Sequence, residues 1–411
     1  MLVKRSGEID MSHELAAAFG ERVRLARQAI RKSQTVVAGL AGITADYLYQ
    51  IERGKKLPAL PVVVQLAHVL GVSVSDLLGE TTPTRTTPPL ESGESIHRAL
   101  THPSTTENSD VDVAGLRDQV HAAWHTWQTS AQRYSRLADQ LPPLITSAEQ
   151  LRKLRSADHA TGEQAAQACA VDLYGLVRTF AKRVGRVDLA LLAAERGITA
   201  AETANDPVRL ASARWNLAHV LLAQYQPEGA EAVALHAAEA VERHVTEDLD
   251  ALALLGALRL LAAVASMRLG NMWTAHDRIR SVVPIAERTG ERNVCWTAFG
   301  PTNVAMYAVN VEVEAGNATE GLRLAERIQP EPTLSIERRV AFRLDQAKGY
   351  NQRQDYAGAL VMLQAASTEA PEDLKYRPAA RTALNTVVQR ARGDIARRAA
   401  HLATRLGAPV A

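Results

Sequence analysis

The sequence has few aromatic residues, little cysteine and no long uninterrupted apolar run. Phe, Trp and Tyr make up 4% of the 411 residues, and the two cysteines, Cys169 and Cys295, lie far apart. Because no zinc-ligand spacing is present, we expect two buried, reduced thiols, no metal and no cofactor. The chain lacks the apolar segment of a signal peptide and any run of about 18 apolar residues, so we expect a cytoplasmic protein without a membrane span.

Helix-favouring apolar sequence is what the chain has in abundance. Hydrophobic residues make up 46% of it, and Ala, Leu, Arg and Glu dominate. These residues favour helices, and no convincing alternating strand pattern occurs. The length indicates two or three domains. We therefore predict an all-α protein.

Positive charge is small overall but concentrated in one segment. The formal net charge is +2. Residues 19–60 contain eight Lys or Arg and three Asp or Glu, a local net of +5, which leaves −3 for the remainder. Phosphate binding requires such a concentration, although any short window of a protein can be basic by chance.

The basic segment contains residues 33–56, SQTVVAGLAGITADYLYQIERGKK, whose spacing is that of two short helices crossing at a tight turn. Ser33 and Thr44 are the expected N-caps. Ala38 is small where the second helix would cross, and Gly42 supplies a left-handed turn conformation. The spacing predicts a helix-turn-helix, with helices at Gln34–Ala41 and Ala45–Arg53.

The surrounding sequence extends this pattern. The motifs RVRLARQAI, SQTVVAGLAG, IERGKKLP and LAHVLGVSVSDLL follow one another at mutually consistent spacings. Together they resemble the lambda-repressor-like XRE family over about residues 18 to 79. The resemblance implies a five-helix DNA-binding domain, which we place at residues 12–80.

The resemblance also implies which residues contact DNA. By position they are Gln34, Thr44, Ala45, Asp46, Tyr49 and Gln50, with Arg53, Lys55 and Lys56 at phosphates. Gln50 is suited to read adenine through two hydrogen bonds. Asp46 departs from the amide- and hydroxyl-rich family pattern, and it either accepts from cytosine or weakens binding by repelling phosphate. Arg27 and Glu52 match a structural ion pair of the family.

A segment rich in Thr, Ser and Pro follows this domain. We interpret residues 81–111 as a flexible linker with a short helix at Ser95–Leu100, because such composition favours turns and extended chain. A flexible linker would let the parts on either side move relative to one another.

Beyond the linker, small residues recur after turns. Five turns are each followed five residues later by a small residue that opens a helix, at Ala190, Ala230, Ala275, Gly321 and Ala359. The steps of 40, 45, 46 and 38 residues resemble tetratricopeptide repeats (TPR) with longer helices. We predict a TPR-like α-solenoid over residues 112–411, with about six helix pairs and a concave inner face.

Polar stripes on apolar helices suggest a ligand site on that inner face. Asn303, Tyr307 and Asn310 are four and then three residues apart. Arg339 and Arg343, one helix pair later, are again four residues apart. The predicted ligand residues are Asn216, Asn303, Tyr307, Asn310, Arg339 and Arg343. Such a stripe is either a binding surface or the solvated side of an amphipathic helix. An XRE domain followed by a TPR-type sensor is similar to peptide-pheromone receptors of Gram-positive bacteria.

No catalytic constellation is recognisable, so we do not expect an enzyme. Gly300-Pro301 should interrupt a long helix after Trp296 and Phe299, which we interpret as core residues. Trp124, Trp127, Trp215 and Trp273 are likewise expected in the core. The interpretation is a homodimeric transcription regulator that binds operator DNA and senses a peptide or small molecule. The alternative is a TPR-type interaction scaffold with weak or lost DNA binding, which Asp46 favours.

Overall fold

The computed structural model describes residues 4–30, 32–70, 72, 74–78, 91–102, 112–153, 160–244, 248–328 and 335–407. These residues are helical apart from their connections and one isolated bridge between Arg292 and Phe299. The all-α prediction is confirmed. The chain divides into two compact units, Met1–Thr86 and Thr87–Ala411, each of which is described by itself.

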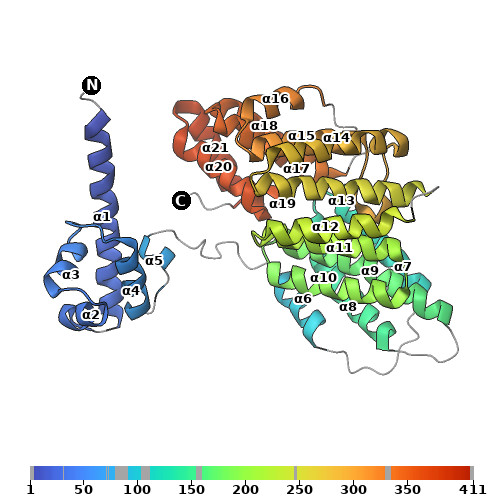
Figure 1. The fold of residues 1–411 in the computed structure, drawn as a ribbon, viewed down its shortest axis with the longest axis horizontal. Coiled ribbons are helices and arrows are strands. Elements are labelled where there is room, and N and C mark those ends of the chain that lie inside the picture. Colours follow the sequence, from blue (N-terminus) through green and yellow to red (C-terminus); the bar gives the residue numbers. More distant parts are fainter. Residues whose placement is uncertain are drawn as a thin grey trace. The chain divides into compact units, whose positions relative to one another are not determined.

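The first unit is a five-helix domain, as predicted. Its helices are α1 (Lys4–Ala29), α2 (Gln34–Leu40), α3 (Ala45–Glu52), α4 (Leu60–Leu70) and α5 (Val74–Leu78) (Figure 1). Helix α1 begins at Lys4, ahead of residue 12, where we expected the domain to start. The small core gathers one or more side chains from every helix, including Phe19, Leu48, Leu66 and Leu77.

Local sequence builds the turn between α2 and α3. The hydroxyl of Ser33 accepts from the amide N–H of Val36 at 3.3 Å, and that of Thr44 accepts from Tyr47 at 3.2 Å. Gly42 has φ +67°, where a residue with a Cβ would be strained. The predicted caps and turn glycine are therefore confirmed.

Two glycines bring α1 against the end of α3. A Cβ on Gly20 would lie 2.1 Å from the carbonyl oxygen of Ile51. Gly54 has φ +68°, and a Cβ there would lie 2.5 Å from the Cα of Ala17. Since neither position has room for a side chain, the two backbones pack directly and fix α3 on the domain.

The second unit is a stack of antiparallel helix pairs that follow one another in chain order (Figure 1). Its helices are α6 (Glu91–Thr101), α7 (Val113–Thr129), α8 (Arg133–Lys153), α9 (Ala160–Arg183), α10 (Val187–Ala204), α11 (Pro207–Ala223), α12 (Pro227–Glu242), α13 (Leu249–Arg268), α14 (Met272–Thr289), the 3₁₀ turn η1 (Val294–Trp296), α15 (Pro301–Glu314), α16 (Ala318–Ala325), α17 (Ile336–Gln352), α18 (Tyr356–Glu369), α19 (Pro371–Tyr376), α20 (Pro378–Arg390) and α21 (Gly393–Arg405). This is the predicted TPR-like solenoid.

Helix α6 lies where a short helix was predicted within the linker. The prediction was Ser95–Leu100, whereas α6 spans Glu91–Thr101 and buries Ile96 and Leu100 in the core of the second unit, so this part of 81–111 is not a flexible linker. Arg196 donates to the carbonyl oxygen of Leu100 at 2.6 Å. The apolar spacing in SIHRAL outweighs the surrounding Thr and Pro. Residues 79–90 and 103–111 lie outside the described part of the chain.

A left-handed residue and a small residue define each repeat. Residues with positive φ occur at Gly185, Tyr225, Gly270, Gly316 and Gln354. Each lies five positions before a residue predicted to open the second helix of a pair, namely Ala190, Ala230, Ala275, Gly321 and Ala359. The four alanines are fully buried, and a Cβ on Gly321 would lie 2.6 Å from a methyl of Val313. Small residues therefore permit each close crossing, as predicted.

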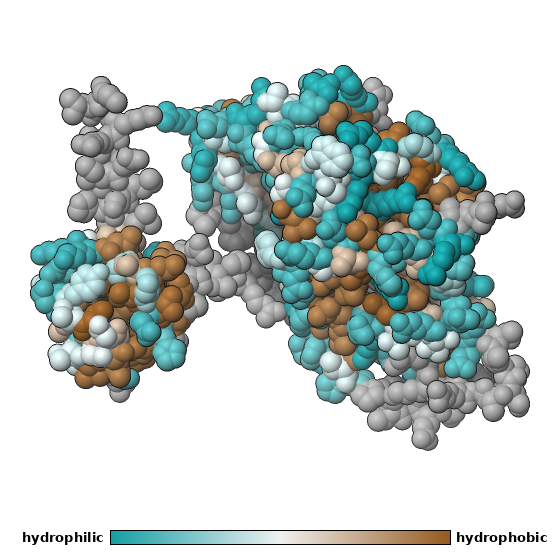
Figure 2. All heavy atoms as spheres, viewed as in Figure 1, coloured by the Kyte–Doolittle hydropathy of each residue, from teal (hydrophilic) through white to brown (hydrophobic). Residues whose placement is uncertain are grey.

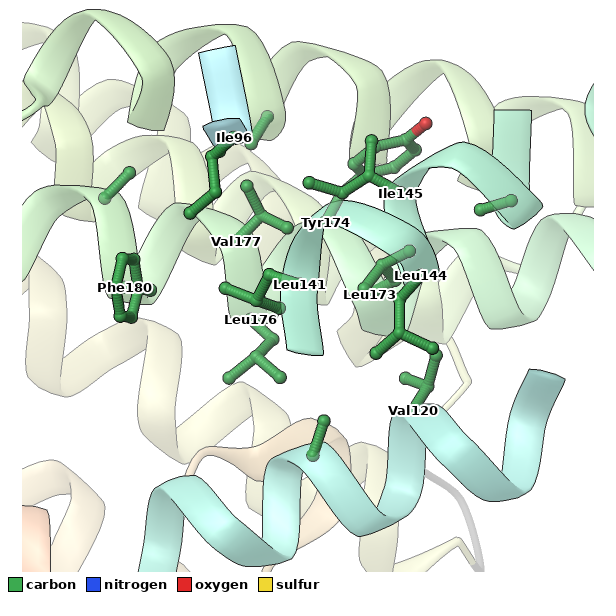
Figure 3. Packing of buried hydrophobic residues seen from close by; sticks show 14 of the residues in the cluster. Ile96, Val120, Leu141, Leu144, Ile145, Leu173, Tyr174, Leu176, Val177 and Phe180 are labelled. Atoms are coloured by element: carbon green, nitrogen blue, oxygen red, sulfur yellow. The ribbon is translucent and has the colours of Figure 1, made fainter. Parts of the chain in front are cut away.

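The core of the stack is continuous apolar packing. Around α9, Leu173, Val177 and Phe180 belong to one apolar cluster with Leu141, Leu144 and Ile145 of α8 (Figure 3). Helix α13 is long and apolar enough to cross a membrane by length and composition, but 83% of its apolar window is buried against other helices of this unit. Such burial is the property of a core helix.

The connection between α14 and α15 interrupts the helix as Gly300-Pro301 predicted. Phe299 is fully buried and packs so closely on α13 that a Cβ on Gly256 would lie 2.2 Å from its ring. Trp127 is also fully buried, as expected. Trp273, in contrast, is 74% exposed, and its prediction as a core residue was wrong. Trp273 is the second residue of α14, directly after a turn, and among the described residues no neighbouring helix covers its side chain there.

Candidate functional sites

Helix α3 presents a polar face on a fixed apolar base. Leu48 and Ile51 are fully buried beneath it. Of the predicted contact residues, Thr44, Asp46 and Tyr49 are exposed, and Ala45 and Gln50 are half-buried. The five side chains therefore belong to one accessible face, with their backbone held from below.

Asp46 and Gln50 interact within that face. The Gln50 Nε2 donates to the Asp46 Oδ2 at 2.7 Å, one helical turn away. One amide hydrogen of Gln50 is therefore engaged in the free protein. Bidentate adenine recognition would require Gln50 to leave Asp46 or to use its other donor.

Three exposed cations lie beyond the end of α3. They are Arg53, Lys55 and Lys56. The guanidinium of Arg53 lies 5.6 Å from the centre of the Tyr49 ring, and the Lys56 ammonium lies 5.6 Å from that of Tyr47. None of the three has a carboxylate within ion-pair distance among the residues described, so each is available to a phosphate.

Gln34 has a structural partner that the resemblance did not predict. Its Nε2 donates to the Glu52 Oε2 at 2.7 Å. Glu52 also accepts from Arg27 at 2.7 and 2.9 Å, which confirms the expected ion pair. The amide of Gln34 therefore helps to position α2 on α3, and only its remaining hydrogen is free for DNA.

Half of the predicted ligand stripe lies in contacts between helices. Arg339 and Arg343 of α17 both donate to Glu369 of α18, Arg343 at 3.1 Å. Asn310 of α15 donates to Asp345 of α17 at 3.1 Å. The stripe therefore does not form the single groove we predicted, because periodicity identifies one side of a helix but not the neighbour against which it packs.

The other predicted ligand residues are buried beside a hollow without lining it. Asn216, Asn303 and Tyr307 are 7%, 2% and 9% exposed. Asn216 accepts a hydrogen bond from Arg178, and the Tyr307 hydroxyl accepts from Arg338 at 3.4 Å. Asn216 and Tyr307 therefore support two arginines that face the hollow, Arg178 and Arg338, whereas no such contact involves Asn303 among the described residues.

The hollow lies among α7, α9, α11, the α14–α15 connection and the start of α17. It comprises ≈ 450 Å³ when the part open to solvent is included. Its lining consists of Trp124, Gln128, Arg178, Thr179, Lys182, Arg183, Trp215, His219, Trp296, Ala298, Ser335, Glu337 and Arg338.

Three tryptophans form the aromatic part of the lining. Trp124 and Trp296 stack with ring centres 5.1 Å apart and planes 5° apart, and Trp215 contacts His219 at 4.3 Å. Trp296 has φ +64°, and Ala298 has φ +50°. Such conformations cost energy and often occur at binding sites. Interpreting these tryptophans as core residues missed their second role as pocket walls.

The single carboxylate of the lining, Glu337, already has hydrogen-bond and ion-pair partners within the protein. Glu337 accepts from the Trp127 Nε1 at 2.8 Å and the Arg183 Nε at 3.0 Å, and Arg377 lies 3.7 Å away. Burial alone would raise the pKa of Glu337, but Arg183, Arg377 and other guanidinium groups hold it well below its usual value. Glu337 is therefore ionised and already neutralised.

The remaining cations lack such a partner. Among the described residues, no carboxylate lies within ion-pair distance of Arg178, Lys182 or Arg338. Burial, followed by Arg183 and Arg178, lowers the pKa of Lys182 well below its usual value. Burial lowers the pKa of Arg178 to about 9, and it lowers that of His219 well below 6.5. With Arg178, Lys182, Arg183 and Arg338 against one carboxylate, the lining has a formal net charge of +3 when all five groups are ionised.

Sequence reasoning missed this cluster. Its clearest signal is VDLYGLVRTFAKR in α9, where Arg178 and Lys182 interrupt an apolar, buried helix one turn apart. The prediction of ligand residues relied on stripes of Asn and other polar side chains, and Arg178 and Lys182 do not belong to such a stripe.

The cysteines offer no chemistry here. Cys169 and Cys295 are unpaired, and burial raises the pKa of both thiols to about 12. The described residues contain no group of three or more His, Cys, Asp or Glu suited to hold a metal ion. The two cysteines are therefore unreactive thiols in the environment shown.

Comparison with known proteins identifies the first domain. Residues 18–78 match the family model of the helix-turn-helix domain, so this part of the chain is a helix-turn-helix domain. No curated protein matches the chain.

Several solved structures show distant similarity. PlcR from Bacillus thuringiensis, in complex with the peptide PapR7 and DNA, is 12% identical with a TM-score of 0.27, covering 66% of this chain and 95% of that chain. Apo ComR from Streptococcus vestibularis is 14% identical with a TM-score of 0.23, covering 66% and 93%. Apo ComR from S. thermophilus is 14% identical with a TM-score of 0.23, covering 87% and 97%. At these values the similarity carries no conclusion about function.

Proposed function

We propose that this protein is a sequence-specific DNA-binding transcription regulator. The observation that carries the proposal is the exposed face of α3, which has polar residues from Thr44 to Gln50 and unpaired cations at its end. An α-helix held on a small domain in this way fits the major groove, where base edges can be distinguished. The cations of residues 53–56 would meet the adjoining phosphates.

A selection experiment tests this directly. The full-length protein would be incubated with random duplex DNA, and the bound sequences would be recovered and compared. Enrichment of one motif, with an affinity that falls as salt rises, is the expected result. A protein that enriches no motif and shows no salt-sensitive DNA affinity would contradict the proposal.

We further propose that the second unit dimerises the protein and senses a peptide or small-molecule effector in the cytoplasm. One helix-turn-helix covers few base pairs, so useful specificity generally requires two copies on a near-palindromic site. An effector would act by binding one arrangement of the dimer more tightly than another. Sedimentation of the protein with and without its selected duplex should show a dimer. A monomer bound to the duplex would reject the dimer.

The alternative is an interaction scaffold whose helix-turn-helix no longer binds DNA. The hydrogen bond between Asp46 and Gln50 favours it, since Asp46 both places a negative charge on the reading face and engages the expected adenine reader. The selection experiment separates the two functions.

A further inference from the structure

The hollow in the second unit holds more positive charge than its surroundings neutralise. Arg178 is 3% exposed, and its only hydrogen bond among the described residues goes to the neutral amide of Asn216. Lys182, one turn further along α9, is half-buried, and its side chain has no hydrogen-bond or ion-pair partner in the same part of the chain. Glu337 cannot neutralise either, because Trp127, Arg183 and Arg377 already occupy it.

Unpaired buried cations destabilise a folded protein. A buried charge without an opposite partner loses its hydration and gains nothing in return, so such residues are rare unless they have a task. Here Arg178, Lys182 and Arg183 also repel one another. The arrangement is unfavourable for folding and favourable for an incoming anion.

Two buried donors strengthen this view. The Nε of Arg178 and the Nε1 of Trp215 are buried and have no acceptor among the described residues. The Arg178 guanidinium lies 5.4 Å from the centre of the Trp215 ring, so both donors belong to the same corner of the hollow. The two unsatisfied donors are positions at which an acceptor of a ligand could bind.

We propose that this hollow binds a small anion, a carboxylate or a phosphate joined to a flat apolar group. The anionic group would be received by Arg178 and Lys182, and the flat group would lie against Trp215 and the stacked pair of Trp124 and Trp296. The ≈ 450 Å³ of the hollow includes space open to solvent, so the hollow would enclose only part of such a ligand. The proposal rests on the proposed function only where it identifies this ligand with the effector.

Titration calorimetry on the full-length protein without DNA tests the site. The probes are benzoate, phenyl phosphate and uncharged benzamide, which share a ring and differ in charge. Binding of benzoate or phenyl phosphate, and not of benzamide, is expected, and the tighter of the two identifies the anionic group. The matched variants are Lys182→Met in the hollow and Arg280→Gln on the exposed face of α14.

Lys182→Met should weaken anion binding about 10- to 100-fold, the effect of one charged hydrogen bond, while Arg280→Gln should leave it unchanged. In the absence of ligand, Lys182→Met should raise the melting temperature of the second unit by about 2 °C or more, because it removes an unpaired, repelled cation. A lysine with a purely structural role would show the opposite sign.

Three results would overturn the proposal. One is benzamide binding as tightly as benzoate and phenyl phosphate. Another is wild-type affinity in Lys182→Met. The third is no heat from any probe up to about 10 mM, a concentration at which even a weak specific site is occupied. The DNA-selection experiment does not affect any of these three results. The anion site and the proposed DNA-binding function can therefore be rejected independently of each other.

Discussion

The protein has two cationic regions, and they differ in their relation to water. The cations after α3 are exposed, whereas in the hollow of the second unit Arg178 is buried and Lys182 is half-buried. Figure 2 shows both hydrophilic and apolar surface on each unit, so hydropathy alone does not distinguish the two regions. Exposed cations keep their hydration and cost little when unpaired, while enclosed cations lose it.

The difference explains what each region is suited to bind. Hydrated cations attract any polyanion, and their contribution weakens as salt rises. Enclosed cations with fixed neighbours discriminate by size and charge, at a cost in stability. Substitutions that change the charge of each region, followed by measurements of stability and binding, therefore test whether exposure to water accounts for the difference.

The largest effect is expected from the enclosed carboxylate. Glu337→Gln should destabilise the second unit by about 3 kcal/mol, because it removes the charge that accepts from Trp127 and Arg183, while Arg377 keeps its ion pair with Asp373. Chemical denaturation measures the change. The control is Glu320→Gln, whose ion pair with Arg323 is exposed and should change stability little. Equal effects from the two substitutions would show that enclosure does not matter.

The exposed cations should behave in the reverse manner. Replacing Arg53, Lys55 and Lys56 together by Ala should weaken DNA binding about 100-fold at moderate salt and reduce the salt slope by about 3, with little change in stability. Fluorescence anisotropy at several salt concentrations measures both. Arg397→Ala, an exposed change in the second unit, should alter neither. A triple variant with an unchanged salt slope would place the phosphate contacts elsewhere.

Substitutions on the polar face of α3, from Thr44 to Gln50, should change the sequence specificity of DNA binding more than its salt dependence. Gln50→Ala should cost about 1–3 kcal/mol on the selected site and relax the preference at one base pair. Competition with site variants measures this. Asp46→Asn keeps an acceptor for Gln50 but removes the charge, so it should tighten binding if Asp46 repels phosphate. Unchanged selectivity in Gln50→Ala would reject this residue as a base reader.

A pH dependence of stability is expected from Asp345. Burial raises the pKa of this carboxyl to about 7 from 3.8, against the hydrogen bond from Asn310. The folded state therefore holds the proton that the unfolded state releases, and stability falls as pH rises between these two values. Asp345→Asn should flatten this part of the stability curve, whereas exposed Asp277→Asn should not. Parallel curves for Asp345→Asn and wild type would refute the shift.

The sequence by itself determined the elements whose cause is local. Ser33 and Thr44 cap the two helices through their own hydroxyls and Gly42 makes the turn through its own backbone, so the helix-turn-helix was predictable to within a residue or two. The repeats were predictable for the same reason, because a turn and a small residue five positions later act within one helix pair.

Tertiary structure alone decided which side chains meet. Arg343 pairs with Glu369 of the neighbouring helix, although the spacing of its stripe resembled that of a ligand groove. The hollow joins Trp124, Lys182 and Trp296, which lie more than a hundred residues apart from first to last. Helical periodicity fixes the angle of a side chain about its own axis. The partner it meets depends on how helices from distant parts of the chain cross, and that is set only when the whole unit is packed.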